Sequence, residues 1–427
     1  MGIKQGYWKK WGGVEEFEIQ GKVTQKTNLQ TIHVVINNNI EKNFTVNNGN
    51  FTLNFKIEDF GKEEWNYIEL TTDDPIFHPS DKCKFFIHNI PSQAAIFIPE
   101  ELVKQGREAN SKNTFDYQKF QVKGYTFISK YFGKESIKEE SDVLKLDKNG
   151  IPMAKYTTGY EYNPVTIAQN ALGTYNEYLD SGSDKQKQYF LTQAEWLVQQ
   201  QNEDGAYPYP FSYQLYDTAV LPQGFISSMA QGQVLSVMAR AYYITADDKY
   251  LECGNKALNF MVKTADNDIF SGGARTLEDI TVLSKDMYEF SDYRVFEEYV
   301  FDPSVYVLNG DLFALIGLYD WASAAPKEFG RATAENAFQE GVKGIEVILP
   351  YYDFYGWSAY DLYYLTEGNS NPTFGSEYAH ACHIYLLESL ADVSGSTCFR
   401  KYAERFKMYK DDEFWKQTKD MYREGVY

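Results

Sequence analysis

Hydrophobic and polar residues alternate with a period of two along much of the first hundred residues. In NFTLNFKIED (50–59), Phe51, Leu53, Phe55 and Ile57 alternate with polar residues, as in a strand with one buried face. The preceding VNNGN supplies the Asn-Gly pair of a tight hairpin turn. Further short strands are predicted at EFEIQGKVT, TIHVVI, NYIELTT and KFFIHNI, at spacings typical of a sandwich. We therefore expect an antiparallel β-sandwich domain over residues 1–98.

From about residue 164 the hydrophobic period changes to 3.6 residues, which predicts amphipathic helices. The stripes are Phe190, Ala194, Leu197 and Val198; Ala230, Val234, Val237, Met238 and Ala241; and Ala334, Phe338, Val342 and Ile345. Roughly eight to ten helices are expected over residues 161–427, arranged as an (α/α) barrel or toroid whose inner helices frame a cleft, or as an irregular helical array. The polar segment 99–160 is expected to be transitional, with FQVKGYTFISKYF (120–132) as a β-hairpin.

Composition narrows the classes of partner. Aromatic residues make up 17% of the 427 residues, with 35 tyrosines among them. Tyrosine and tryptophan suit clefts that stack sugar rings, and equally suit aromatic cores. The formal net charge of −19 argues against nucleic acid or an anionic membrane surface as a partner. An acidic polymer would need a local basic group set against that charge.

Cysteine usage and hydropathy bear on location. Cys83, Cys253, Cys382 and Cys398 lie far apart without a CxxC pair, which predicts free thiols in a reducing compartment. No apolar run approaches the ~18 residues of a membrane-spanning helix. The first residues, MGIKQGYWKKWGG, lack the apolar stretch of a secretion signal. We expect a cytoplasmic location, unless a leader has been removed.

Carboxylates and phenols are the candidate chemical groups. In FEEYVFDPSVYVLNGDLFALIGLYD (296–320), a carboxylate of Glu297 or Glu298 can orient the phenol of Tyr299 or act as a base; the alternative is a solvated acidic loop with one packed tyrosine. In WSAYDLYYL (357–365), Tyr360 is a similar candidate or a packed aromatic.

Histidines contribute one further segment, SEYAHACHIYLLESL (376–390). His380 and His383 could bind a metal with Cys382, but the helical stripe places His383 on a buried face, which favours a core histidine. We find no phosphate loop, GxSxG, HExxH or dinucleotide fingerprint, and we predict no metal and no cofactor.

The C-terminal two-thirds of the chain resembles the D-glucuronyl C5-epimerase family, which converts glucuronate to iduronate within heparosan-type chains. The matching stretches are YNPVTIAQNAL, WLVQQQNEDGAYP, SSMAQGQVLSVMARAY, EEYVFDPSVYVLNGDLFALIGLYD and AYDL. The resemblance implies a β-sandwich followed by an (α/α) barrel, and catalytic roles for Glu298, Tyr299, Tyr360 and Tyr378. There are two departures from the family pattern. Tyr363 stands where the family has an arginine, and Tyr378 is displaced by one residue relative to His383.

Inversion at carbon 5 of a uronate needs two acid/base groups on opposite faces of the ring and a partner for the carboxylate. We expect Tyr299 and Tyr360 to face one another across the ring, with Glu298 beside one of them. Arg275 and Arg294 are candidates to bind the carboxylate. Further substrate-binding candidates are Tyr363, Asn309, Gln231, His383 and Tyr207.

The predicted function is therefore a bacterial polysaccharide uronate C5-epimerase, an isomerase with an acidic polysaccharide substrate and a possible homodimer. A uronate polysaccharide lyase shares the first step and remains an alternative. So does a glycoside hydrolase that uses Glu298 with Asp361 as paired carboxylates. A non-catalytic glycan-binding protein that keeps the aromatic cleft is the third alternative.

Overall fold

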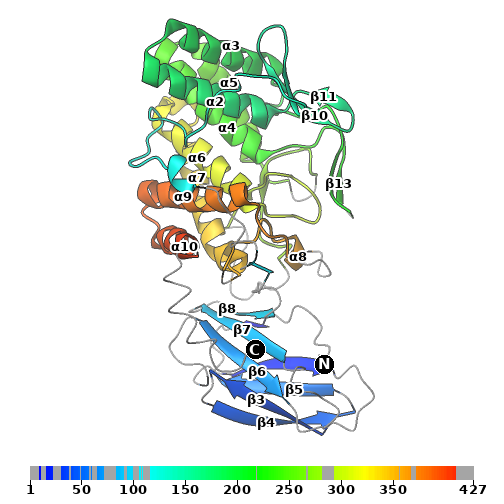
Figure 1. Ribbon diagram of the computed structural model, residues 1–427. Coiled ribbons are helices and arrows are strands. Elements are labelled where there is room, and N and C mark those ends of the chain that lie inside the picture. Colours follow the sequence, from blue (N-terminus) through cyan, green and yellow to red (C-terminus); the bar gives the residue numbers. More distant parts are fainter. Residues whose placement is uncertain are drawn as a thin grey trace.

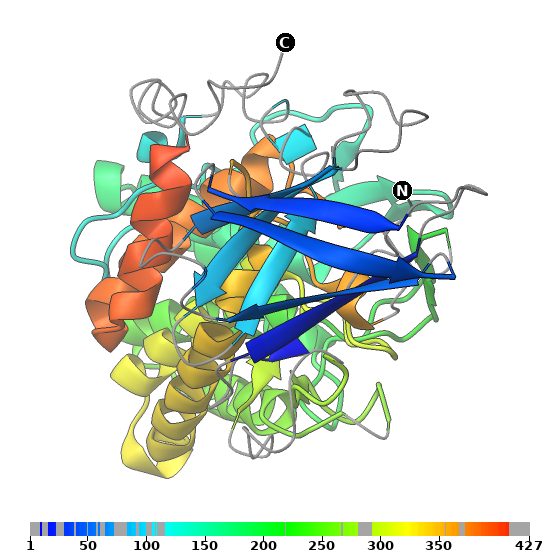
Figure 2. The same cartoon turned by 90° about the horizontal axis from the view of Figure 1, so that it is seen from below.

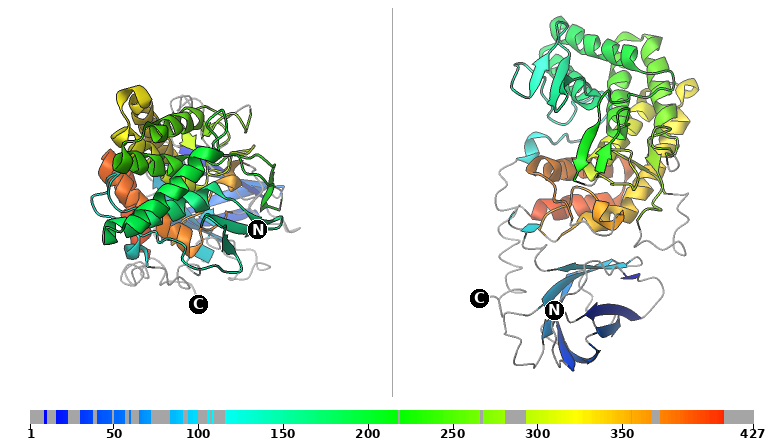
Figure 3. Two further views of the ribbon diagram at one scale, coloured as in Figure 1. Left: turned by 90° about the horizontal axis from the view of Figure 1, so that it is seen from above. Right: turned by 90° about the vertical axis from the view of Figure 1, so that its right-hand side faces the viewer.

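The computed structural model places the N-terminal strands at one end of the molecule and the long helices at the other (Figures 1 and 3). It describes residues 9–10, 16–22, 30–37, 40–48, 50–56, 59, 65–71, 83–90, 94–99, 105–106, 108, 116–217, 219–265, 268–280, 293–354, 356–366 and 372–409.

The N-terminal strands form one eight-stranded antiparallel sheet in the order β1-β8-β7-β6-β3-β4-β5-β2 (Figure 2). They are β1 (Lys9–Lys10), β2 (Glu16–Lys22), β3 (Thr31–Ile36), β4 (Ile40–Asn47), β5 (Asn50–Lys56), β6 (Trp65–Thr71), β7 (Cys83–Ile90) and β8 (Ala94–Pro99). The predicted strands are confirmed as β2, β3, β5, β6 and β7, whereas β4 and β8 were not predicted. The division of these strands into the two layers of a sandwich stays a prediction, as do the domain boundaries.

The alternation in β5 has the expected cause. Phe51, Leu53 and Phe55 are buried, and the residues between them are exposed. Asn47 pairs with Asn50 across the turn, and Asn48 has a φ of 50°, as a two-residue hairpin turn of this kind requires. The Asn-Gly hairpin is therefore confirmed; Ile57 lies outside the described residues.

The first of the long described helices begins with Pro164, which follows the side-chain cap of Asn163. They are α2 (Pro164–Ser181), α3 (Asp184–Gln200), α4 (Ser228–Thr245), α5 (Asp248–Met261), α6 (Leu308–Ala324), α7 (Arg331–Ile348), α8 (Tyr363–Thr366), α9 (Glu377–Ser394) and α10 (Thr397–Met408). The predicted stripes fall on α3, α4 and α7 and are buried, apart from the half-buried Val198.

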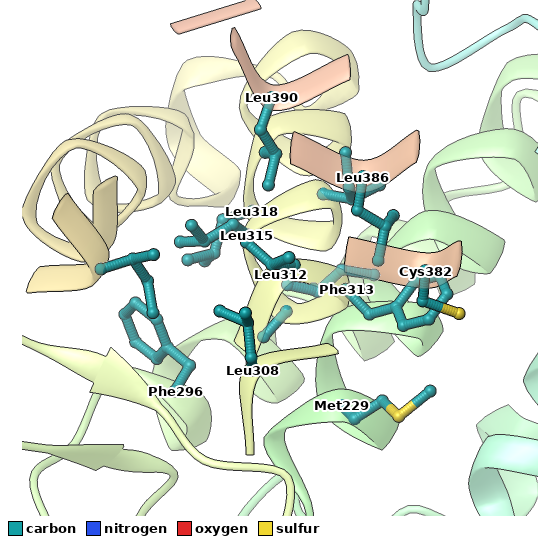
Figure 4. Close-up of a cluster of buried hydrophobic side chains, with 14 of the residues drawn as sticks. Met229, Phe296, Leu308, Leu312, Phe313, Leu315, Leu318, Cys382, Leu386 and Leu390 are labelled. Atoms are coloured by element: carbon teal, nitrogen blue, oxygen red, sulfur yellow. The ribbon is translucent and has the colours of Figure 1, made fainter. Parts of the chain in front are cut away.

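The long helices form four hairpins in two layers. The pairs α2–α3, α4–α5, α6–α7 and α9–α10 pack along the chain, and α2, α4, α6 and α9 contact one another in that order as an inner row. Inner and outer helices thus alternate along this row, and its closure into an (α/α) barrel stays a prediction. Figure 4 shows the core between two inner helices, where Leu312 and Leu315 of α6 meet Leu386 and Leu390 of α9.

Two glycines let the inner helices α4 and α6 approach closely. A Cβ atom at Gly317 would lie 2.0 Å from the carbonyl oxygen of Gly232, and one at Gly232 would lie 2.6 Å from the Cα of Ala314. Only glycine fits at such a crossing. These are the glycines of the MAQGQ and LIGLYD stretches, so both motifs encode helix packing.

The predicted hairpin at 120–132 is wrong. These residues form turns and irregular backbone after the short 3-10 helix η3 (Tyr117–Lys119), because helix side chains satisfy their polar groups. Asn176 of α2 accepts from the backbone N–H of Tyr131 at 2.7 Å and donates to its carbonyl at 3.1 Å. Tyr125 donates to Asp320 of α6, which forms a fully buried ion pair with Arg240 of α4 at 2.7 Å. The segment is therefore part of the helical core.

The sheet of region 99–160 lies further along, as β9 (Leu144–Leu146), β10 (Pro152–Tyr156) and β11 (Gly159–Glu161). Shorter pairs are β12 (Tyr213–Tyr216) with β13 (Ala219–Leu221) and β14 (Ala274–Arg275) with β15 (Val295–Phe296). Across the described ranges, no helix is both long and apolar enough to cross a membrane.

Candidate active site

A cleft of about 680 Å³ opens at one end of the inner helices. Its described lining is Lys134, Tyr156, Asn163, Val165, Gln169, Tyr209, Phe211, Tyr213, Phe225, Met229, Glu298, Tyr299, Asn309, Tyr360, Thr373, Phe374, Ser376, Tyr378 and Ala379. Aromatic rings dominate this set, and several of them stack. The ring centroids of Tyr209 and Phe225 are 4.2 Å apart, and those of Tyr213 and Tyr299 are 6.0 Å apart. Such walls suit the flat faces of sugar rings.

All four inner helices point their N-terminal ends at the cleft. Val165 of α2, Met229 of α4, Asn309 of α6 and Tyr378 of α9 each belong to a first turn, and all line the cleft. The N-terminal end of a helix carries a partial positive charge. The fold therefore provides a local field that favours an anionic ligand in a chain of net charge −19.

Glu298 is the acidic residue among the described cleft residues, and its side chain is 8% exposed. Burial raises its pKa to about 7, and a hydrogen bond with Tyr299 acts in the opposite direction. The Asn309 side chain donates to Glu298 Oε2 at 3.4 Å. A carboxyl group with such a pKa is suited to take up and release a proton near neutral pH.

The neighbouring Glu297 has a structural task. It is fully buried, and its Oε1 accepts from the backbone N–H groups of Val305 and Tyr306 at 2.9 and 2.8 Å. These bonds fix the loop that leads into α6. The chain bends at Glu298, whose side chain lines the cleft. The Glu-Glu pair is thus divided between holding the loop and serving the cleft.

Tyr299 and Tyr360 are neighbours in the wall of the cleft. Each is half-buried at the cleft wall, and their hydroxyls hydrogen bond to each other, while Tyr299 also hydrogen bonds to Glu298. Both side chains pack in one cluster at the cleft wall, and their placement on opposite faces of a sugar ring stays a prediction. Burial raises the pKa of both phenols well above the usual value. They are therefore acids or hydrogen-bond donors at neutral pH.

Tyr378 lies in the first turn of α9, and the one-residue displacement does not remove it from the cleft. Its hydroxyl accepts a hydrogen bond from the ammonium of Lys134, which also lies over its ring at 4.7 Å. Burial raises the pKa of Tyr378 well above the usual value, so it too is protonated at neutral pH. All four predicted catalytic residues thus line one cleft, with Glu298 as its carboxylate.

Neither predicted arginine lines the cleft. Arg275 is 3% exposed. Its guanidinium donates hydrogen bonds to Ser304 Oγ at 2.7 Å, to the Ala265 carbonyl at 2.8 Å and to Asp279 at 2.9 Å. Arg294 donates to the Val262 carbonyl and pairs with Glu340. Both predictions fail because local acceptors hold these guanidinium groups within the packing.

Among the other predicted binding residues, Asn309 lines the cleft and four residues do not. Tyr363 is buried and stacks on Tyr216 at 5.1 Å. Gln231 donates to the carbonyls of Gly205 and Ala257 inside the helical core. The Tyr207 hydroxyl contacts Cys253 Sγ at 3.3 Å. These three side chains are buried among packing partners, which removes them from the substrate surface.

His383, the fourth, is fully buried with His380, and both Nδ1 atoms lie 2.7 Å from the Ser358 hydroxyl. Burial lowers the pKa of His383 to about 3, so the ring is neutral. Within the described residues, no group of three potential ligands gathers at one point. The core-histidine interpretation, which the sequence analysis favoured over metal binding, fits this geometry.

The sequence analysis missed several cleft residues, notably Lys134, Gln169 and Tyr213. Lys134 lies just beyond the segment mistaken for a hairpin, and no motif marks it. Gln169 and Asn163 stand within YNPVTIAQNAL, so that matching stretch was an available signal. Tyr213 begins β12, one strand of a short pair beside the cleft.

Comparisons with known proteins relate part of this chain to one family. The sequence profile of the family described as D-glucuronyl C5-epimerase C-terminus matches residues 200–408. A D-glucuronyl C5-epimerase of Caenorhabditis elegans is 34% identical over 230 residues, which are 52% of this chain and 34% of that protein. An uncharacterised protein of Methanocaldococcus jannaschii is 26% identical over 318 residues, covering 66% of this chain and 94% of that protein.

The chain therefore spans about a third of the C. elegans relative. A solved structure titled as a polysaccharide lyase matches 93% of this chain and 46% of its own at 11% identity, with a TM-score of 0.31. The matched segment contains Glu298, Tyr299, Tyr360 and Tyr378, and the inner helices α4, α6 and α9. Residues 200–408 of this chain thus match the D-glucuronyl C5-epimerase C-terminus family.

Proposed function

We propose that this protein is a polysaccharide uronate C5-epimerase that converts D-glucuronate to L-iduronate units within a glycan. The observation that carries the proposal is the pairing of Glu298, whose pKa is about 7, with the protonated phenol of Tyr378 in one aromatic cleft. These groups come from different elements, the loop before α6 and the first turn of α9. One can thus act as base and the other as acid.

The reaction begins with the loss of the carbon-5 proton, which is α to the carboxylate. Glu298 takes this proton as its carboxylate, and the electron pair moves into the carboxylate group, which gains a second negative charge. The helix N-terminal ends around the cleft favour that charge. Tyr378 then donates its proton to carbon 5 from the other face. Exchange with water restores both groups.

Tyr299 and Tyr360 support this chemistry from the wall of the cleft. The Tyr299 hydroxyl donates to Glu298, which orients the carboxylate and favours its charged form. Tyr360 in turn holds the Tyr299 hydroxyl. The two phenols thus form a hydrogen-bonded wall on the side of the cleft that carries the base.

Solvent exchange at carbon 5 tests the function. Heparosan oligosaccharide incubated with the protein in deuterated water should gain deuterium at carbon 5 and iduronate units, with its chain length unchanged. Both E298Q and Y378F should lose conversion. Under a two-base mechanism, one variant retains exchange starting from glucuronate and the other retains exchange starting from iduronate.

Other outcomes would redirect the assignment. Chain cleavage with an unsaturated, ultraviolet-absorbing product would identify a lyase, and binding without exchange would identify a glycan-binding protein. The hydrolase alternative finds little support, because Asp361 is fully buried and bound by the Tyr216 hydroxyl and the Tyr363 N–H. Its carboxylate is not available as the second carboxylate of a glycosidase.

A further inference from the structure

Lys134 is the basic residue among the described residues that line the cleft. It lies on the irregular segment that packs against α2, where Asn176 Nδ2 donates to the Lys134 carbonyl at 2.9 Å. The same Asn176 holds the backbone of Tyr131. The backbone beneath Lys134 is therefore fixed to an inner helix, and its side chain enters the cleft from a defined position.

The ammonium of Lys134 contacts neutral groups. It donates to the Tyr378 hydroxyl and to Gln169 Oε1 at 3.4 Å, and it lies over the rings of Tyr378 and Phe313 at 4.7 and 5.7 Å. Within the described part of the chain, no carboxylate forms an ion pair with it. A half-buried cation without an anion is costly, and an ammonium has three hydrogens to donate. The site is thus preformed for an anionic ligand.

The carboxylate of a uronate would reach this position together with carbon 5. Tyr378 is the proposed acid at carbon 5, and the carboxylate is attached to that same carbon. A cation hydrogen bonded to the Tyr378 hydroxyl therefore lies next to the region that the carboxylate must occupy. Position 363, where an arginine is the family pattern, holds a tyrosine stacked away from the cleft.

We propose that Lys134 binds the substrate carboxylate and makes the cleft specific for uronates over neutral sugars. The inference rests on the proposed function, and it deepens that function by naming the group that recognises the acid. An ammonium–carboxylate hydrogen bond also becomes stronger as charge accumulates on the carboxylate during proton abstraction. Lys134 thus takes the place of the arginine that the family pattern has at position 363. It supplies an ammonium group from a different segment of the fold.

Binding measurements on matched ligands test this proposal. Three heparosan hexasaccharides, with free carboxylates, with methyl esters and with carboxyl groups reduced to alcohols, are titrated calorimetrically against E298Q, in which turnover is blocked. E298Q should bind the free acid at least about tenfold more tightly than either neutral form, the usual scale for a charged hydrogen bond. In E298Q/K134Q this preference should fall to about onefold, and in E298Q/K134R it should largely survive.

The control is K138Q in the same background. Lys138 is exposed on the same segment and pairs with Glu177 at 3.6 Å, so its removal should leave the preference intact. A role of Lys134 limited to positioning Tyr378 would weaken all three ligands equally. That result overturns the proposal. So does a preference for the free acid that survives in E298Q/K134Q, or the absence of such a preference in E298Q itself. Failure of deuterium exchange would count against the proposed function alone, because the binding assay needs no turnover.

Discussion

The side chain of Glu298 packs directly onto Gly310 in the first turn of α6. A Cβ atom at position 310 would lie 2.2 Å from the Glu298 Cβ and 2.7 Å from its Oε2. The glycine of the VLNG stretch is therefore the surface on which the proposed base rests, and it brings the carboxylate against the positive end of a helix.

Replacement of Gly310 by alanine should displace Glu298 and reduce kcat by about 100-fold or more, because acid/base catalysis depends on position at the ångström scale. Helix propensity favours alanine over glycine by about 1 kcal/mol, which offsets part of the steric cost to folding. Kinetics and thermal unfolding of G310A measure both effects. Full activity in a folded G310A would contradict the assigned contact.

The pH dependence of catalysis should report Glu298. Its pKa is raised to about 7, and only the ionised form can accept a proton, so kcat/KM should be low at pH 5 and rise to a plateau above about pH 8. A profile of kcat/KM against pH checks this. Any residual activity of E298Q should lack this rise of kcat/KM between about pH 5 and 8. An unchanged rise in E298Q would show that Glu298 is not the base.

Tyr299→Phe should shift the rise of kcat/KM with pH to higher pH. The hydrogen bond from Tyr299 lowers the pKa of Glu298, whereas burial raises it. Loss of the hydrogen bond should therefore raise this pKa further. We expect kcat to fall by about tenfold to 100-fold, with part of the loss recovered as the pH rises. Y360F keeps the Tyr299–Glu298 hydrogen bond and is the matched control. In this variant, kcat/KM should rise at the same pH as in the unaltered protein.

Glu297 should matter for stability. E297A strands the N–H groups of Val305 and Tyr306, at a cost of about 1–3 kcal/mol each in the free energy of unfolding. E297Q retains the accepting oxygen and should be milder. Denaturant unfolding of the two variants compares them, and equal losses would show that the two backbone bonds contribute little.

Glu297 also makes stability depend on pH. Burial raises its pKa to about 7, above the ordinary value of about 4.3, so the folded state binds the extra proton between these values. The contribution of this group to stability is present below about pH 4 and is lost as the pH rises through 7. Over that range, E297Q should lose less stability than the unaltered chain. An identical pH profile would contradict the assignment.

Local sequence patterns were sufficient where a local force decides the outcome. The alternation of Phe51, Leu53 and Phe55 predicted a strand, because every second side chain of a strand faces the same way. The helical stripes predicted α3, α4 and α7 for the corresponding reason at a period of 3.6. The Glu-Glu-Tyr stretch could be named as a candidate from its residue types, although not which glutamate faces the cleft.

Only the tertiary structure decided which charges reach the cleft. Arg275 and Arg294 lie near the candidate residues in sequence, yet acceptors from other elements hold them in the packing. Lys134 lies more than 160 positions from Glu298 and reaches the cleft because side chains of α2 hold its irregular backbone. A cleft at the ends of four helices gathers residues by where those helices start, and sequence separation does not record that convergence.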